Sequence, residues 1–267
     1  MNFNSHVQPA NHILFMFLFK NISSLRLAAL CCITIFISCH KPYYIQERKS
    51  DNYTIDKTLQ TDAKINDFLS PYKKGVDTQM QVVIGSTDMM LTKSQPECSL
   101  GNFMADAQLI GARKIDKDVQ FSVMNYGGIR LSYISPGTIT RGKIYELMPF
   151  DNMLTVIEVP GNIVKQFCDF MARAEGWPVS GISFMIKDKK AINILIQGKP
   201  LNENLVYKMA ISDYIAKGGD NCDFLTPLKK KFTAVFVRDL FIEYIENLSA
   251  QHKPLHVEIE NRISYAE

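Results

Sequence analysis

The stretch Val119–Arg130, VQFSVMNYGGIR, joins a strand-forming run directly to a loop that holds two adjacent glycines. Apolar residues dominate its first half, Val119–Met124, which is typical of a strand buried in a sheet. The second half, Asn125–Arg130, places an amide and a guanidinium on a glycine-rich turn. The ends of strands are where a rigid scaffold displays its binding groups. The stretch therefore predicts a polar, ligand-binding loop at one edge of a sheet.

Three other stretches combine Gly or Pro with polar or aromatic residues in the same way. They are ECSLGNFMADA (97–107), LMPFDNML (147–154) and DYIAKGGD (213–220). In the last of them, Gly218 and Gly219 let the backbone turn tightly between the ring of Tyr214 and the carboxylate of Asp220. Taken alone, KGGD is most simply a turn. Together, the four stretches indicate several loops that contribute to one site.

The rest of the chain mixes helices and strands without the regular strand–helix–strand rhythm of a parallel sheet. Predicted strands are MLTVIEV (153–159), LVYKMAIS (205–212) and LHVEIE (255–260), and predicted helices are 61–69, 161–174 and 233–248. The first of these helices is expected to stop before Pro71. No repeat or linker follows residue 60, so we expect one α+β domain over residues 61–267.

Composition excludes some classes of function. The chain has 267 residues, a formal charge of +3 and 21% charged residues, without a basic tract, so a nucleic-acid polymer is not expected as a partner. Outside the first forty residues only Cys98, Cys168 and Cys222 remain, and these predict buried thiols rather than a disulfide framework. Only His252 and His256 lie in the same part, which is too few for a hydrolytic metal centre. We therefore expect no metal and no cofactor on this chain.

The N-terminal forty residues resemble a bacterial lipoprotein signal. Lys20 and Arg26 precede the apolar run LAALCCITIFISC (27–39), which is too short to span a bilayer comfortably. Residues 1–39 are thus expected to be a signal peptide whose cleavage leaves Cys39 as a lipid anchor, with residues 40–60 as a polar tether. Phe36 departs from the commonest pattern, and a plain signal peptide or an uncleaved anchor is the alternative. The protein is expected to be exported and membrane-anchored, on the periplasmic or the cell-surface face.

The order and spacing of the four stretches resemble the C-terminal, substrate-binding domain of the 5'-nucleotidase family. The family patterns N-x-G-N-[LF]-x-x-D-A, N-G-G-G-I-R, G-x-[IL]-[TS]…P-F-x-N and F-[LI]-A-x-G-G-D correspond to 99–107, 125–130, 137–152 and 214–220. The resemblance covers about residues 80–260. It implies a single mixed-sheet α/β domain with α-β-β-α layers.

The resemblance also implies a nucleotide site. Phe150 and Tyr214 would sandwich the base, Asn152 would meet the base edge, and the backbone of Gly181 would lie close to the base. Asp220 would accept hydrogen bonds from the ribose hydroxyls, and Asn125 and Arg130 would contact the substrate, with Gly127, Gly128, Gly218 and Gly219 shaping the loops. These residue types suit the task, because bases stack on flat rings, carboxylates accept from vicinal hydroxyls and guanidinium groups bind phosphate.

Each assignment has a plainer alternative. Arg130 could pair with a surface carboxylate, and Phe150, after a proline, could belong to the core. Tyr126 replaces the first glycine of the family loop, and Lys93 is the only cation where some members have phosphate-binding arginines. Asn102 and Asp106 are expected to have structural roles, because Asp106 lies mid-helix between apolar neighbours.

The signatures of the family's metallophosphoesterase domain, D-x-H and G-N-H-[DE], do not occur in this sequence. We therefore expect the nucleotide-binding half of a 5'-nucleotidase-type hydrolase, inactive alone. It would bind a nucleoside monophosphate or a nucleoside, and a separately encoded metallophosphoesterase would supply the divalent metals. One alternative is a stand-alone nucleoside- or nucleotide-binding lipoprotein for scavenging. Another is a structural domain that has lost its ligand.

Overall fold

The computed structural model describes residues 52, 54, 59 and 62–267. The chain divides into two units, Met1–Gln60 and Thr61–Glu267. The predicted signal peptide, Cys39 and nearly all of the predicted tether lie outside the described residues. None of the described helices is long and apolar enough to cross a membrane.

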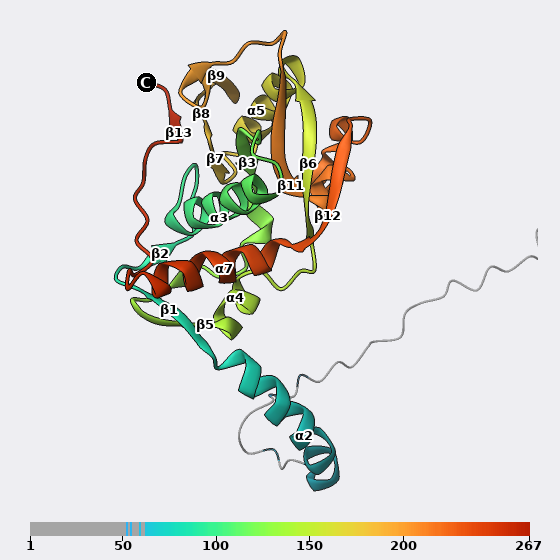
Figure 1. Cartoon of the computed structure of the whole chain (residues 1–267), viewed down its shortest axis with the longest axis vertical. Coiled ribbons are helices and arrows are strands. Elements are labelled where there is room, and N and C mark those ends of the chain that lie inside the picture. Colours follow the sequence, from blue (N-terminus) through green and yellow to red (C-terminus); the bar gives the residue numbers. More distant parts are fainter. Residues whose placement is uncertain (1–51, 53, 55–58, 60–61) are drawn as a thin grey trace, which may run out of the picture. The chain divides into compact units, whose positions relative to one another are not determined.

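A five-stranded sheet forms the centre of the second unit (Figure 1). Its order is β12 (Lys230–Phe236), β6 (Met153–Pro160), β11 (Val206–Ser212), β3 (Phe121–Val123) and β7 (Val179–Ser180). The central strand β11 runs antiparallel to β6 and parallel to β3. The carboxyl ends of β3 and β11 therefore lie at the same edge of the sheet as the amino end of β6.

A second sheet has the order β10 (Lys199–Pro200), β9 (Lys190–Ile196), β8 (Ile182–Lys187) and β13 (Ile263–Tyr265). Two small antiparallel pairs complete the strands: β1 (Val83–Thr87) with β5 (Gly137–Thr140), and β2 (Leu91–Thr92) with β4 (Tyr133–Ile134). Both larger sheets contain parallel and antiparallel pairs. The expectation of one mixed α+β domain is confirmed.

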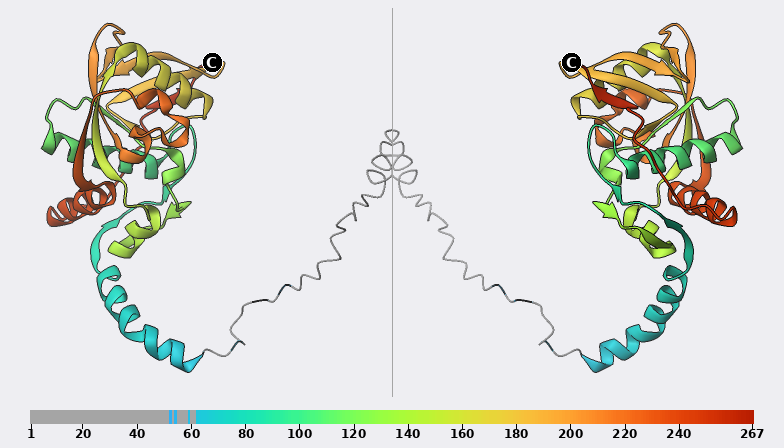
Figure 2. Two further views of the ribbon diagram at one scale, coloured as in Figure 1. Left: turned by 90° about the vertical axis from the view of Figure 1, so that its right-hand side faces the viewer. Right: turned by 90° about the vertical axis from the view of Figure 1, so that its left-hand side faces the viewer.

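Two hydrophobic clusters lie on opposite faces of the five-stranded sheet. Because side chains alternate along a strand, Leu154 and Val156 of β6 join one cluster, and Ile157 and Val159 join the other. The first cluster contains α3 (Ser99–Ile115) and α7 (Val237–Ala250), which lie beside one another in both views of Figure 2. The second contains α5 (Gly161–Arg173), which packs against β6 and β9.

The other helical elements are α2 (Ala63–Met80), α4 (Arg141–Leu147), α6 (Asp213–Ala216) and the short turns Tyr126–Gly128, Gly219–Asn221 and Asp223–Leu225. Three predictions of elements were wrong. Helix α2 continues through Pro71 to Met80; its residues before Met80 are exposed, so water can satisfy the carbonyl that Pro71 leaves without a donor. The helix predicted at 233 begins at Val237, because the residues before it pair with β6 as β12. Residues 255–260 form no strand, and β13 follows them.

Candidate functional site

A cavity of about 370 Å³ opens at the sheet edge where the ends of β3, β11 and β6 meet. Its lining consists of Asn125, Gly127, Arg130, Phe150, Asn152, Tyr214 and Asp220. The loop after β3 supplies the first three, the segment before β6 supplies the next two, and the chain after β11 supplies the last two. Every predicted binding residue except Gly181 is therefore brought together, because the strand directions carry all three segments to one edge.

Gly181 lies elsewhere, and the structure does not support its predicted role beside a base. Strand β7 runs antiparallel to β3 with Ser180 opposite Ser122, so Gly181 is carried towards the beginning of β3. Asn125 follows the other end of β3. The carbonyl of Gly181 accepts a hydrogen bond from the backbone N–H of Gln197 at 2.9 Å, and Gly181 lines a separate hollow with Ile182 and Leu195.

Two aromatic residues in the cavity lining are exposed to solvent. Tyr214 is 44% exposed and Phe150 is 38% exposed, whereas most large apolar residues of the unit are buried. Among the described residues, neither ring packs on another aromatic ring. The alternative that Phe150 belongs to the core is therefore not supported, and both rings are available to a flat ligand.

The ring of Tyr214 lies directly on the backbone of Gly219. A Cβ atom at Gly219 would come within 2.6 Å of two ring atoms, so only glycine leaves room for the ring in this position. Gly218 adopts a φ of 97°, which favours glycine for a different reason. The two glycines of KGGD thus shape the loop that carries Tyr214 and Asp220.

The carboxylate of Asp220 is held by hydrogen bonds from both walls of the cavity. Asn125 Nδ2 donates to Oδ2 at 2.8 Å, and Tyr214 Oη donates to Oδ1 at 2.8 Å. The bond to the carboxylate favours the protonated phenol and raises the pKa of Tyr214. Asn125 is itself buried, at 7% exposure, and its side chain lies over Gly128, where a Cβ would be 2.9 Å from Asn125 Oδ1.

The positive charge of the site comes from the loop after β3. Arg130 is exposed, forms no salt bridge within the described part of the chain, and has its guanidinium 5.9 Å from the centroid of the Phe150 ring. The alternative that Arg130 pairs with a surface carboxylate is therefore not supported. Lys93 approaches the same loop: its Nζ donates to the carbonyl of Ile129 at 2.8 Å and lies 4.3 Å from the ring centroid of Tyr126. Burial, and then the charge of Arg130, lower the pKa of Lys93.

Sequence reasoning missed Arg238, which fixes the segment that bears Phe150. Arg238 is 6% exposed, pairs with Asp151 at 2.8 Å and donates to the carbonyl of Phe150 at 3.2 Å. Its guanidinium also lies 3.9 Å from the ring centroid of Tyr145. Nothing in the local sequence marks this arginine, because its partners come from the segment 145–151, far away along the chain.

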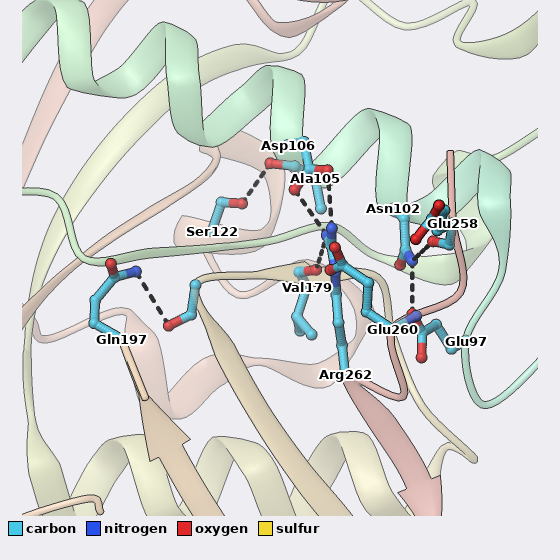
Figure 3. Close-up of polar contacts among 11 residues, drawn as sticks. Glu97, Asn102, Ala105, Asp106, Ser122, Val179, Gln197, Glu258, Glu260 and Arg262 are labelled. Atoms are coloured by element: carbon cyan, nitrogen blue, oxygen red, sulfur yellow. Dashed lines mark hydrogen bonds and ion pairs between the residues drawn. The ribbon is translucent and has the colours of Figure 1, made fainter. Parts of the chain in front are cut away.

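Asn102 and Asp106 have the structural roles predicted for them (Figure 3). Asn102 donates to Glu97 at 2.6 Å and to the carbonyl of Glu258 at 3.0 Å. Asp106 accepts two hydrogen bonds from Arg262, at 2.7 and 2.9 Å. Both residues tie α3 to the C-terminal segment and lie outside the cavity lining.

A family model matches most of the second unit and identifies the family of this chain. The model of the 5'-nucleotidase C-terminal domain matches residues 78–227, a span that contains the entire cavity lining. The chain belongs to this family.

Similar proteins of this family include a 5'-nucleotidase of Vibrio vulnificus, which is 29% identical over 67% of this chain and 33% of that relative. Protein UshA of Escherichia coli is 27% identical over 66% of this chain and 32% of that relative. Among solved structures, the 5'-nucleotidase precursor of Thermus thermophilus has a TM-score of 0.66 at 25% identity, over 76% of this chain and 43% of that one. The chain thus spans about a third of the length of these curated relatives.

The residues of this 5'-nucleotidase C-terminal domain do not fit a catalytic metal centre. Within residues 62–267 and the three described before them, no group of three or more His, Cys, Asp or Glu side chains could hold a metal ion. His256 pairs with Asp88 instead, at 2.9 Å.

Proposed function

We propose that this chain is the nucleotide-binding half of a 5'-nucleotidase-type hydrolase, and that it positions a nucleoside monophosphate. The observation that carries the proposal is the cavity at the sheet edge. There the exposed rings of Phe150 and Tyr214 lie together with the hydrogen-bonded carboxylate of Asp220 and with Arg130, which forms no salt bridge within the described unit. Each of these groups matches one part of a nucleotide.

The base would stack between Phe150 and Tyr214, which are both exposed, and such stacking contributes about 1–3 kcal/mol per base. The amide of Asn152 would meet the base edge. The carboxylate of Asp220 would accept hydrogen bonds from the ribose hydroxyls. Arg130 offers a planar fork of donors to the phosphate, with Lys93 as a second cation behind it.

Hydrolysis requires an activated water and neutralisation of the phosphoryl charge, which a metal centre can provide. Because the described residues do not fit such a centre, we propose that a separately encoded metallophosphoesterase supplies it. The matched relatives that are named 5'-nucleotidases are about three times longer than the matched region. They therefore contain further chain beside this domain, and this supports the proposal that another part supplies the metal centre.

Export and anchoring belong to the same proposal. The sequence pattern at 20–39 supports cleavage before Cys39 and its acylation. A cell wall protein of Listeria monocytogenes, 28% identical over 63% of this chain, supports a place at the cell surface.

A second candidate function is the capture of nucleosides or nucleotides for uptake. The observation in its favour is that Arg130 is the one cation in the described lining of the cavity, so recognition rests largely on the base and ribose contacts. A scavenging receptor of this kind would bind adenosine and AMP about equally.

Release of inorganic phosphate from AMP tests the first proposal. The purified chain with Mn²⁺ should release none. It should support release when mixed with a metallophosphoesterase that the same genome encodes without a C-terminal domain, and Arg130→Gln should reduce that rate. Release of phosphate by the chain alone would contradict the proposed division.

A further inference from the structure

The Tyr214 hydroxyl has a role that base stacking does not require. A phenylalanine at this position would offer the same ring face to a base. The hydroxyl instead donates to Asp220 Oδ1 at 2.8 Å, while Asn125 donates to Oδ2 at 2.8 Å. Tyr214, which is proposed to stack on the base, is therefore hydrogen-bonded to Asp220, which is proposed to recognise the ribose.

The loop that carries Asp220 gives this bond its importance. Asp220 and Asn221 adopt φ values of 52° and 65°, and Gly218 adopts 97°, so the carboxylate projects from a tight left-handed turn. Its two side-chain bonds reach different segments: one goes back to α6 and the other crosses the cavity to the loop after β3. The orientation of the carboxylate is thus set by Tyr214 and Asn125 together.

An ionised carboxylate has two oxygens with about four acceptor positions in total. Asn125 and Tyr214 each use one, on different oxygens. One position remains on each oxygen, which matches two vicinal hydroxyl groups presented side by side. A carboxylate free to rotate would have to lose that freedom when the ligand binds, and this weakens binding.

We infer that the Tyr214 hydroxyl is a specificity-determining, positioning group, which orients Asp220 to accept both hydroxyls of a ribose cis-diol. It makes the site selective for ribosides over free bases and dideoxyribosides. The inference rests on the proposed nucleotide site and adds to it a determinant of the class of sugar. The raised pKa of Tyr214 agrees with a phenol held on a carboxylate.

The test compares three ligands on the purified full chain by calorimetric titration: adenosine, 2',3'-dideoxyadenosine and adenine. Tyr214→Phe keeps the ring and removes the hydroxyl, and Tyr265→Phe, at an exposed position outside the cavity, is the matched control. Tyr214→Phe should weaken adenosine binding about 3- to 10-fold, from the cost of ordering one side chain. Adenine and dideoxyadenosine should change less than twofold, and the control should change nothing.

A second arm separates positioning from general disturbance of the loop. In an Asp220→Asn background, Tyr214→Phe should have no further selective effect on adenosine, because the carboxylate through which it acts is gone. Unchanged adenosine affinity in Tyr214→Phe, an equal loss for all three ligands, or a selective loss that persists in Asp220→Asn would each overturn the inference. A wild-type protein that binds all three ligands equally would overturn the inference while nucleotide binding stands. A wild-type protein that binds none would overturn the proposed function as well.

Discussion

At the scale of single residues, the two exposed rings are the groups on which binding most depends. Phe150→Ala and Tyr214→Ala should each weaken adenosine binding about 5- to 150-fold, which corresponds to the loss of one stacking face at about 1–3 kcal/mol. Tyr265→Ala removes a ring of similar exposure outside the cavity and should leave the affinity unchanged. Calorimetric titration measures all three. Wild-type affinity in both cavity variants would show that the base does not stack there.

The glycines of the site allow a second, matched comparison. A methyl group at Gly219 would come within 2.6 Å of the Tyr214 ring, whereas at Gly127 it would meet nothing closer than 3.9 Å. Gly219→Ala should therefore displace the ring and weaken adenosine binding about tenfold, a loss that corresponds to the value of one stacking contact. Gly127→Ala should bind within about twofold of the wild type. If the two variants bind equally well, the packing of Tyr214 on Gly219 is not important for the site.

At the scale of elements, the pair Asp106–Arg262 joins helix α3 to the C-terminal segment. The two side chains are only 27% and 13% exposed and form a bidentate contact. Asp106→Asn should lower the free energy of unfolding by about 2–3 kcal/mol, because the mostly buried Arg262 charge loses its bidentate partner and keeps only the exposed Glu260 as a counter-charge. Urea denaturation measures the change.

The exposed pair Lys114–Glu243 is the control for that comparison, since both of its side chains are about half exposed. Glu243→Gln should change the unfolding free energy by less than about 0.5 kcal/mol. A similar small effect of Asp106→Asn would show that the C-terminal segment is held by its apolar contacts instead.

Strand β11 and the loop after α3 carry a pair that makes stability depend on pH. The side chain of Lys208 donates to Asp116 at 2.8 Å, and this hydrogen bond is the main cause of the lowered pKa of Asp116. A carboxyl whose pKa is lower in the folded chain than in the unfolded chain stabilises the fold at pH values above its unfolded pKa of about 3.9. That contribution is lost as the pH falls through the lower, folded value.

Asp116→Asn should therefore be less stable than the wild type at pH 7, and the difference should shrink as the pH falls below about 4. Thermal unfolding at a series of pH values measures it, with Asp67→Asn on the exposed helix α2 as the control. A difference that stays constant down to pH 2 would mean that Asp116 acts by something other than its charge.

How far the sequence predicts an element depends on whether local or distant residues decide it. Strands β6 and β11 follow from apolar patterns within their own residues, and they lie where these patterns predict. Strand β12 does not, because its last residues, 233–236, read as the beginning of a helix until their pairing with β6 is known. Gly181 was misplaced for the same reason, since the antiparallel pairing of β7 with β3 decides which end of the sheet it reaches.

At the scale of the whole molecule, the sheet order explains why three of the four sequence stretches line the cavity and the fourth does not. Three of them flank β3, β6 and β11, whose directions bring Asn125, Phe150 and Tyr214 to one edge. The fourth, at 97–107, begins helix α3 and ties the C-terminal segment to it. Order along the chain predicted the family, but the strand directions determine which stretches line the cavity.

Helix α2 exposes apolar side chains that no packing within the described unit covers. It has no buried residue, and its apolar side chains Ile65, Phe68, Leu69, Tyr72 and Val76 are all exposed. The matched region also covers only about a third of the length of the curated relatives. The exposed apolar side chains of α2 agree with the partner chain proposed above.

The central claim is that the cavity of this domain binds a nucleotide without a metal. The most direct measurement is calorimetric titration of the purified protein with AMP and with adenosine in the presence of EDTA. We expect saturable binding of both, with AMP about tenfold tighter or more, because Arg130 adds a charge-assisted contact to the phosphate. Arg130→Gln should remove that difference. Equal binding of AMP and adenosine would favour a nucleoside receptor, and the absence of binding to either ligand would contradict the account.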